Sequence, residues 1–70
     1  MGMTEKIKIL LIKRKMTVKE LAEKLGYTSQ NLSGKFKRDN FSERELFEIA
    51  QALDCTFVAR FIMNDTGETI

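Results

Sequence analysis

Residues 17–38 of this chain, TVKELAEKLGYTSQNLSGKFKR, decide the fold because they predict two short helices joined by a tight turn. Thr17 followed three residues later by Glu20 is a capping box, in which each side chain binds a backbone N–H group that the start of a helix leaves free. Apolar residues then recur at three- and four-residue spacing as far as Leu25, which predicts one buried face. Gly26 can take the left-handed conformation that ends a helix. The first helix is therefore expected to stop at this glycine.

The second helix of the stretch begins at a hydroxyl residue. Thr28 or Ser29 can accept a hydrogen bond from its first turn, and Leu32 and Phe36 then recur on one inward face. Gly34 lies inside this helix, where glycine costs about 1 kcal/mol relative to alanine. The order of cap, helix, glycine, cap and helix is the layout of a helix-turn-helix motif.

The same residues carry a resemblance to a known family. The stretch resembles the phage repressor/Cro type of helix-turn-helix regulators, the Xre-like family, and the similarity extends over about residues 4–53. The matching residues are Thr17, Glu20, Leu21, Ala22, Leu25, Gly26, Thr28 and Leu32. The resemblance implies a mainly α fold, a small four- to five-helix bundle whose third helix enters the DNA major groove. It also implies a sequence-specific transcriptional regulator, here taken as a repressor, with double-stranded DNA as its partner.

Two further stretches predict the remaining helices of a DNA-binding domain over residues 4–54. Thr4 can cap a first helix, in which apolar residues and lysines recur at helical spacing. Ser42 followed by Glu45 is a second capping box, and a wide apolar face follows it. Residues 38–41, which precede this box, are expected to form a loop.

Candidate DNA contacts follow from the expected docking of the second motif helix. Residues on the exposed face near the start of a recognition helix meet base edges, whereas cationic and polar residues around it meet phosphates. The amides of Gln30 and Asn31 offer a donor beside an acceptor, which matches the N6 and N7 edge of adenine and predicts a preference for A·T pairs. The expected base contacts are Ser29, Gln30, Asn31, Ser33 and Gly34. The expected phosphate contacts are Thr17, Lys19, Lys35, Lys37, Arg38, Asn40 and Arg44.

The charge distribution agrees with one basic, DNA-facing side. The net charge is only +2, but residues 1–38 contain ten lysines and arginines against three glutamates, a balance of +7. Residues 39–70 contain two arginines against seven acids, a balance of −5. The basic half carries the motif, as expected for a surface that neutralises phosphates.

The pattern changes after Leu53. Residues 56–63, TFVARFIM, are rich in β-branched and aromatic residues and alternate with period two, so they predict one β-strand within the segment 55–64. No second strand is expected in the chain, and a lone strand leaves its backbone groups unpaired. It is therefore expected to pair with its copy across a two-fold axis in a homodimer, followed by a flexible tail over residues 65–70. The expected dimerisation residues are Phe57, Val58, Ala59, Arg60, Phe61 and Ile62.

Length and composition restrict the other classes of function. Seventy residues suffice for one small domain, and the apolar run of the first helix is too short to span a membrane. With a single cysteine, Cys55, and no histidine, the usual zinc spacings and histidine-based acid–base pairs are absent, so no metal and no cofactor are expected. No pattern brings two carboxylates together in a pocket, and a non-enzyme is expected. The absence of a signal peptide predicts a cytoplasmic protein.

Two alternative functions remain open, and both involve an unidentified protein partner. In an antitoxin-like module, DNA binding serves only autoregulation and the C-terminal strand is the partner-binding edge. In a pure interaction domain, DNA binding has been lost. Val18 and Gly34 support this alternative, because relatives often have a glutamine and a larger base-contacting residue there. For the oligomeric state, the alternative is a monomer whose tail folds over its own helices.

Overall fold

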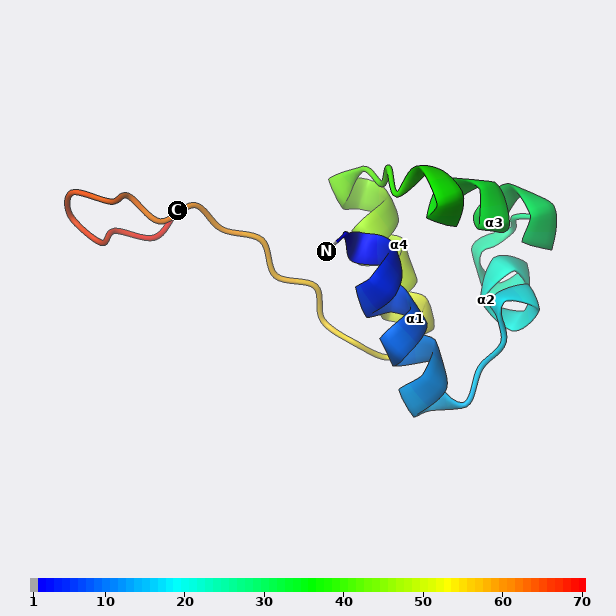
Figure 1. Cartoon of the computed structure of the whole chain (residues 1–70). Helices are drawn as coiled ribbons and strands as arrows, with labels where there is room; N and C mark the ends of the chain where they lie inside the picture. The colour runs from blue at the N-terminus through cyan, green and yellow to red at the C-terminus, as the bar shows by residue number, and fades with distance from the viewer. Residues whose placement is uncertain (1) are drawn as a thin grey trace.

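Four α-helices form the regular part of the chain within residues 2–70, which the structure describes (Figure 1). The computed structural model places them in the order α1 (Met3–Arg14), α2 (Val18–Leu25), α3 (Ser29–Arg38) and α4 (Glu43–Ala52). These bounds confirm the mainly α prediction and the helix-turn-helix layout of α2 and α3. None of the helices described has the length and apolar character needed to cross a membrane.

Both predicted capping boxes are present. Thr17 Oγ1 accepts a hydrogen bond from the Glu20 N–H group at 3.1 Å, and Glu20 Oε1 accepts one from the Thr17 N–H group at 3.0 Å. Ser42 and Glu45 make the same two bonds at the start of α4, at 3.1 and 2.8 Å. Each box satisfies two N–H groups that would otherwise be free. Gly26 ends α2 in the left-handed conformation, with a φ angle of 77°.

The start of α1 differs from the prediction, because Thr4 lies inside the helix and does not cap it. The N-cap is Gly2, which has no side chain that could accept a capping hydrogen bond. The Asp39 carboxylate, at the end of α3, supplies the missing acceptor, since its Oδ1 lies 2.9 Å from both the N–H nitrogen and the hydroxyl oxygen of Thr4. These hydrogen bonds hold the pKa of Asp39 below its usual range. Asp39 therefore joins the first turn of α1 to the end of α3.

The core lies between the four helices and consists mainly of aliphatic side chains. Leu21 of α2 and Leu32 of α3 are fully buried, and Leu53 closes the core just after α4. The other buried apolar residues are Ile7, Leu11, Ala22, Phe36, Ile49 and Ala50. Helix α2 packs against both α3 and α4. Because burial of one leucine contributes about 1.5–3 kcal/mol, this core holds α3 in a defined orientation on the bundle.

The predicted C-terminal strand is absent from the described residues, so this part of the fold prediction is wrong. After α4, residues 55–60 form a connecting segment without regular secondary structure, and only Ile62 and Thr69 form an isolated antiparallel bridge. Phe61 and Ile70 exchange backbone hydrogen bonds of 2.9 and 2.8 Å. Residues 61–70, here called the C-terminal hairpin, run away from the helices and fold back on themselves (Figure 1).

The physical reason is that an extended segment needs a partner. A lone strand leaves its N–H and C=O groups unpaired, and the turn before Gly67, whose φ angle is 76°, lets the segment pair with itself. The sequence analysis expected no second strand in the chain to pair with this segment. Residues 68–70 instead form the returning arm of the hairpin. The connecting segment touches the bundle where the Phe57 ring meets Phe47 edge-on, with centroids 5.4 Å apart.

Candidate nucleic-acid interface

Helix α3 is anchored to the bundle by two buried side chains, Leu32 and Phe36. Its N-terminus is fixed by Thr28, whose hydroxyl accepts a hydrogen bond from the Asn31 N–H group at 3.1 Å. Residues four apart share one face of a helix, so the inward pair leaves the opposite side of α3 free. We call this side the outward face of α3, and it consists of Gln30, Asn31, Gly34, Lys37 and Arg38.

Two shallow hollows lie on this side of α3. One is lined by Ser29, Gln30, Ser33, Gly34 and Lys37, and the other by Tyr27, Gln30, Asn31, Gly34, Lys35 and Arg38. Gln30 and Gly34 border both hollows, so the structure brings all five predicted base-contact residues together on one surface. Four of the five are exposed and Gly34 is half-buried. Their contact with bases stays a prediction.

Gly34 has no partner within the protein that requires a glycine. A Cβ atom built on it would meet only the Arg38 guanidinium, with Nη1 at 3.5 Å, which is an ordinary contact distance. The backbone of Gly34 is helical, so the left-handed conformations that favour glycine are not involved either. The cost of a glycine inside a helix is therefore not recovered by packing in the fold.

Six of the seven predicted phosphate contacts have exposed side chains, and two of them, Lys37 and Arg38, lie on the outward face of α3 itself. The exposed ones are Thr17, Lys19, Lys37, Arg38, Asn40 and Arg44. Arg44 is paired with Glu48, but their closest N–O distance is 3.9 Å and the arginine side chain is 90% exposed. Such a surface pair is weak and leaves the cation accessible.

Lys35 differs from the other predicted phosphate contacts because it is already paired. Its ammonium group forms a salt bridge with Glu45 Oε2 and lies 5.9 Å from the centre of the Tyr27 ring. The bond from Lys35, followed by that from the Ser42 N–H group, lowers the pKa of Glu45. Lys35 therefore joins α3 to α4, and a phosphate would have to compete with a carboxylate for it.

The start of α2 combines attraction and repulsion for an anion. Free N–H groups and the helix dipole favour negative charge there, and Lys19 is exposed beside them. The Glu20 carboxylate already occupies the first turn, and its hydrogen bonds with Thr17 lower its pKa. A phosphate at this helix start would therefore meet the Glu20 charge as well as the Lys19 cation.

Two residues that matter for the site were not found from the sequence. Asp39 holds the end of α3 against α1, and Glu45 neutralises Lys35 on the same surface. The capping role of Glu45 was predictable from its spacing to Ser42. Its salt bridge with Lys35 was not, because that contact depends on how α3 and α4 pack. Asp39 lies 35 residues from Thr4, so no local pattern indicates their contact.

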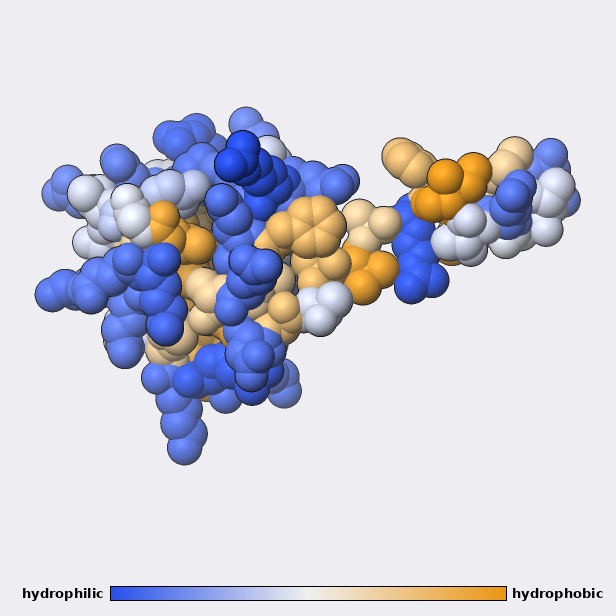
Figure 2. Space-filling model, turned by 180° about the vertical axis from the view of Figure 1, so that it is seen from behind, coloured by the Kyte–Doolittle hydropathy of each residue, from blue (hydrophilic) through white to orange (hydrophobic). Residues whose placement is uncertain are grey.

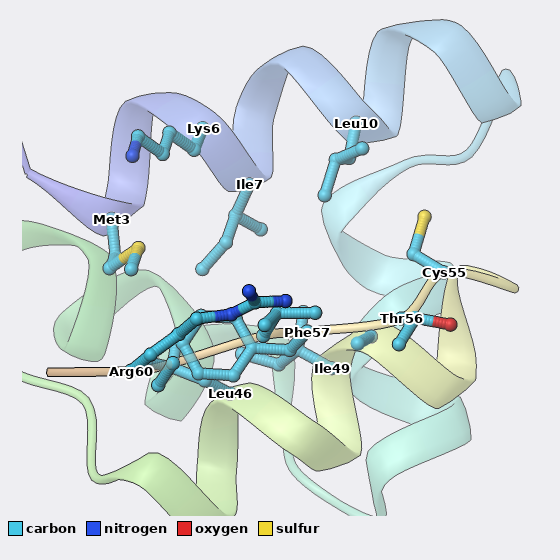
Figure 3. Close-up of a pocket in the computed structure, with 13 residues that line it drawn as sticks. Met3, Lys6, Ile7, Leu10, Leu46, Ile49, Cys55, Thr56, Phe57 and Arg60 are labelled. Atoms are coloured by element: carbon cyan, nitrogen blue, oxygen red, sulfur yellow. The ribbon is translucent and has the colours of Figure 1, made fainter. Parts of the chain in front are cut away.

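A second surface feature lies away from α3. Helices α1 and α4 and the connecting segment line an apolar groove of about 540 Å³, and Figure 3 shows Phe57 and Arg60 lying across α4, opposite Ile7 and Leu10 of α1. Figure 2 shows apolar side chains gathered where the chain leaves the bundle and on the C-terminal hairpin. Of the six predicted dimerisation residues, Phe57 is half-buried and the other five are exposed.

Comparison with protein families agrees with this geometry. The model of the Cro/C1-type HTH DNA-binding domain matches residues 6–58. The matched region includes all four helices except the start of α1, and with them the whole outward face of α3. Searches of curated proteins and of solved structures give no significant match. Because the family model covers well over half of the seventy residues, this chain belongs to the Cro/C1-type helix-turn-helix DNA-binding domain family.

Proposed function

We propose that this DNA-binding regulator is a sequence-specific repressor that acts as a homodimer and places α3 in the major groove of its operator. The observation that carries the proposal is the outward face of α3, where two exposed amides stand beside two exposed cations with no ion pair among residues 2–70. Recognition helices read bases from such a face. The family match supports the DNA-binding part of the proposal.

Base reading is assigned to the N-terminal half of the outward face. Gln30 and Asn31 can each donate to and accept from adenine, so each half-site should contain at least one A·T pair at a defined position. Ser29 and Ser33 flank them and can bind either edge of a base. The orientation needed for this readout is supported by the inward anchors Leu32 and Phe36.

Phosphate binding is assigned chiefly to Lys37, Arg38 and Asn40, with Arg44 and Lys19 at the margins. These contacts position the protein and make its affinity depend on salt, because each neutralised phosphate releases counterions. Lys35 is ranked last, since its salt bridge with Glu45 must weaken before it can bind a phosphate.

The homodimer is supported by the apolar surface of the C-terminal region. Phe61 and Ile62 are 81% and 67% exposed in the single chain, and residues 56–60 have no strand partner within the described chain. A second copy would cover this surface and pair with the free backbone. Two recognition helices about 34 Å apart could then read the two halves of a palindrome, and the bound dimer would block transcription by occupying the site.

Selection from a randomised duplex library tests the proposal. The most enriched sequence is expected to be a palindrome whose half-sites are one helical turn apart. Fluorescence anisotropy on this duplex at two salt concentrations should show an affinity that falls steeply as the salt concentration rises. Light scattering at micromolar concentration should give the mass of two chains. Failure to enrich any sequence would contradict base reading, and the mass of one chain would contradict the dimer.

The apolar groove favours a second candidate, an interaction module whose partner is another protein. The groove and the exposed hairpin supply a surface of the kind that binding partners cover. If the protein is only an interaction module, it should show no salt-sensitive affinity for DNA. The anisotropy measurement therefore separates the two functions directly.

A further inference from the structure

The side chain of Arg38 folds back over Gly34. A Cβ atom at Gly34 would lie 3.5 Å from Arg38 Nη1 and 4.0 Å from Nη2, so the guanidinium occupies space that a larger side chain at residue 34 would fill. Both residues line one hollow together with Gln30 and Asn31. The guanidinium therefore stands on the outward face of α3, one turn closer to the amides than its own Cα atom.

This placement follows from helix geometry. Side chains of a helix point toward its N-terminus and cover the turn before their own position. For Arg38 that turn is the one centred on Gly34, where the missing side chain leaves room. The Arg38 side chain is exposed and has no salt bridge or hydrogen bond within residues 2–70, so its donors are free to bind another molecule.

We propose that Arg38 is a specificity-determining residue that reads a guanine, rather than only a phosphate anchor; this rests on the proposed insertion of α3 into the major groove. A guanidinium presents two parallel donors that match O6 and N7 of guanine, which is the commonest specific contact in the major groove. The Gly34 gap lets this group reach the base edges from the last turn of α3. Gln30 and Arg38 then form one reading surface.

The spacing of the two groups predicts where the guanine lies. The guanidinium covers Gly34, which is four residues from Gln30, and four residues of helix rise by about 6 Å. Successive base pairs are separated by about 3.4 Å. The guanine is therefore expected one or two base pairs from the adenine that Gln30 reads.

Two substitutions separate base reading from phosphate binding. Arg38→Lys keeps the positive charge but loses the paired donors, and Arg38→Ala loses both. Lys37→Ala is the matched control, because Lys37 is an exposed cation of the same helix turn. Each full-length variant is first used for library selection. Anisotropy then measures its affinity for the sequence that the wild-type protein enriches most, and for a duplex in which the predicted G·C pair of each half-site is replaced. Circular dichroism checks that each variant is folded.

The wild-type protein is expected to discriminate against the replaced pair by about 5- to 150-fold. Arg38→Ala should abolish this discrimination and Arg38→Lys should weaken it, because an ammonium group lacks the planar pair of donors, whereas Lys37→Ala should retain it and bind both duplexes more weakly by a similar factor. Retention of the guanine preference by both Arg38 variants would overturn the inference and leave the proposed function intact. Absence of any selected sequence for the wild-type protein would overturn both.

Discussion

The four-helix bundle and the C-terminal hairpin use their large apolar residues in opposite ways. Leu21 and Leu32 of the bundle are 0% exposed, whereas Phe61 and Ile62 of the hairpin are 81% and 67% exposed. A helix forms its backbone hydrogen bonds within itself and needs a partner only for one face. A strand needs a partner for its backbone as well as for its face. The bundle therefore buries its apolar face within one chain, whereas the hairpin pairs part of its backbone with itself and leaves its apolar side chains exposed.

The largest effect should come from removing a core side chain. Leu32→Ala is expected to lower the free energy of unfolding by about 2–5 kcal/mol, because it leaves a cavity under α3. Phe61→Ala is its counterpart in the hairpin and, at protein concentrations low enough to keep the chain monomeric, should change the free energy of unfolding of the bundle by less than about 0.5 kcal/mol. Urea denaturation followed by circular dichroism measures both. Equal losses in the two variants would show that the hairpin packs on the bundle.

The next effect concerns association instead of folding. If a second copy covers the hairpin, Phe61→Ser with Ile62→Ser should weaken the dimer by roughly 1.5–3 kcal/mol for each side chain that is no longer buried. Sedimentation equilibrium gives the dissociation constant. Ile12→Ser, on the exposed side of α1, is the control and should leave it unchanged. A dimer that is equally strong in both variants would place the interface elsewhere.

A smaller effect on stability distinguishes Gly34, inside helix α3 of the bundle, from Gly67, in the turn of the hairpin. Gly34→Ala should raise the free energy of unfolding by about 0.5–1 kcal/mol, because Gly34 is helical and a Cβ atom there meets Arg38 at an ordinary 3.5 Å. Gly67 has a φ angle of 76°, so alanine would strain the hairpin turn. Gly67→Ala should nevertheless leave the unfolding of the bundle unchanged. Thermal denaturation of both variants tests this, and a destabilised Gly34→Ala bundle would contradict it.

The smallest effect is a dependence on acid pH. Hydrogen bonds from Thr4 lower the pKa of Asp39 in the folded state, so its stabilising contribution is present above the unfolded pKa of about 4 and is lost as the pH falls through the lower folded value. Asp39→Asn should therefore lower the urea midpoint at pH 7 and approach the wild-type midpoint at about pH 3. Asp65→Asn, in the hairpin, is the control and should leave the urea midpoint of the bundle at pH 7 unchanged. A constant difference between Asp39→Asn and wild type from pH 7 to 3 would contradict this linkage.

The sequence was sufficient for features that depend on neighbouring residues. The capping boxes at Thr17 and Ser42 and the turn at Gly26 each involve groups a few residues apart, and all three are present. The family match confirms the helix-turn-helix interpretation that these features supported. For the site, the same helical spacing gathered the five base-contact candidates on one side of α3.

Contacts between distant residues could not be predicted in this way. The Asp39 bond to Thr4 spans 35 residues, and the Arg14 bond to the Leu53 carbonyl oxygen spans 39. The salt bridge that occupies Lys35 likewise depends on the packing of α3 against α4. The strand prediction failed for a related reason, because the period-two pattern of residues 56–63 indicates an apolar face but does not say which segment will pair with it.

The central claim is that the outward face of α3 reads DNA sequence, and one comparison of affinities tests it most directly. Gln30→Ala removes an amide from this face, and Gln51→Ala removes another exposed amide, which belongs to α4. On the selected duplex, anisotropy should show a loss of about 1–3 kcal/mol for Gln30→Ala, confined to particular base pairs, and wild-type affinity for Gln51→Ala. Wild-type affinity for Gln30→Ala, or the same loss in both variants, would contradict the claim.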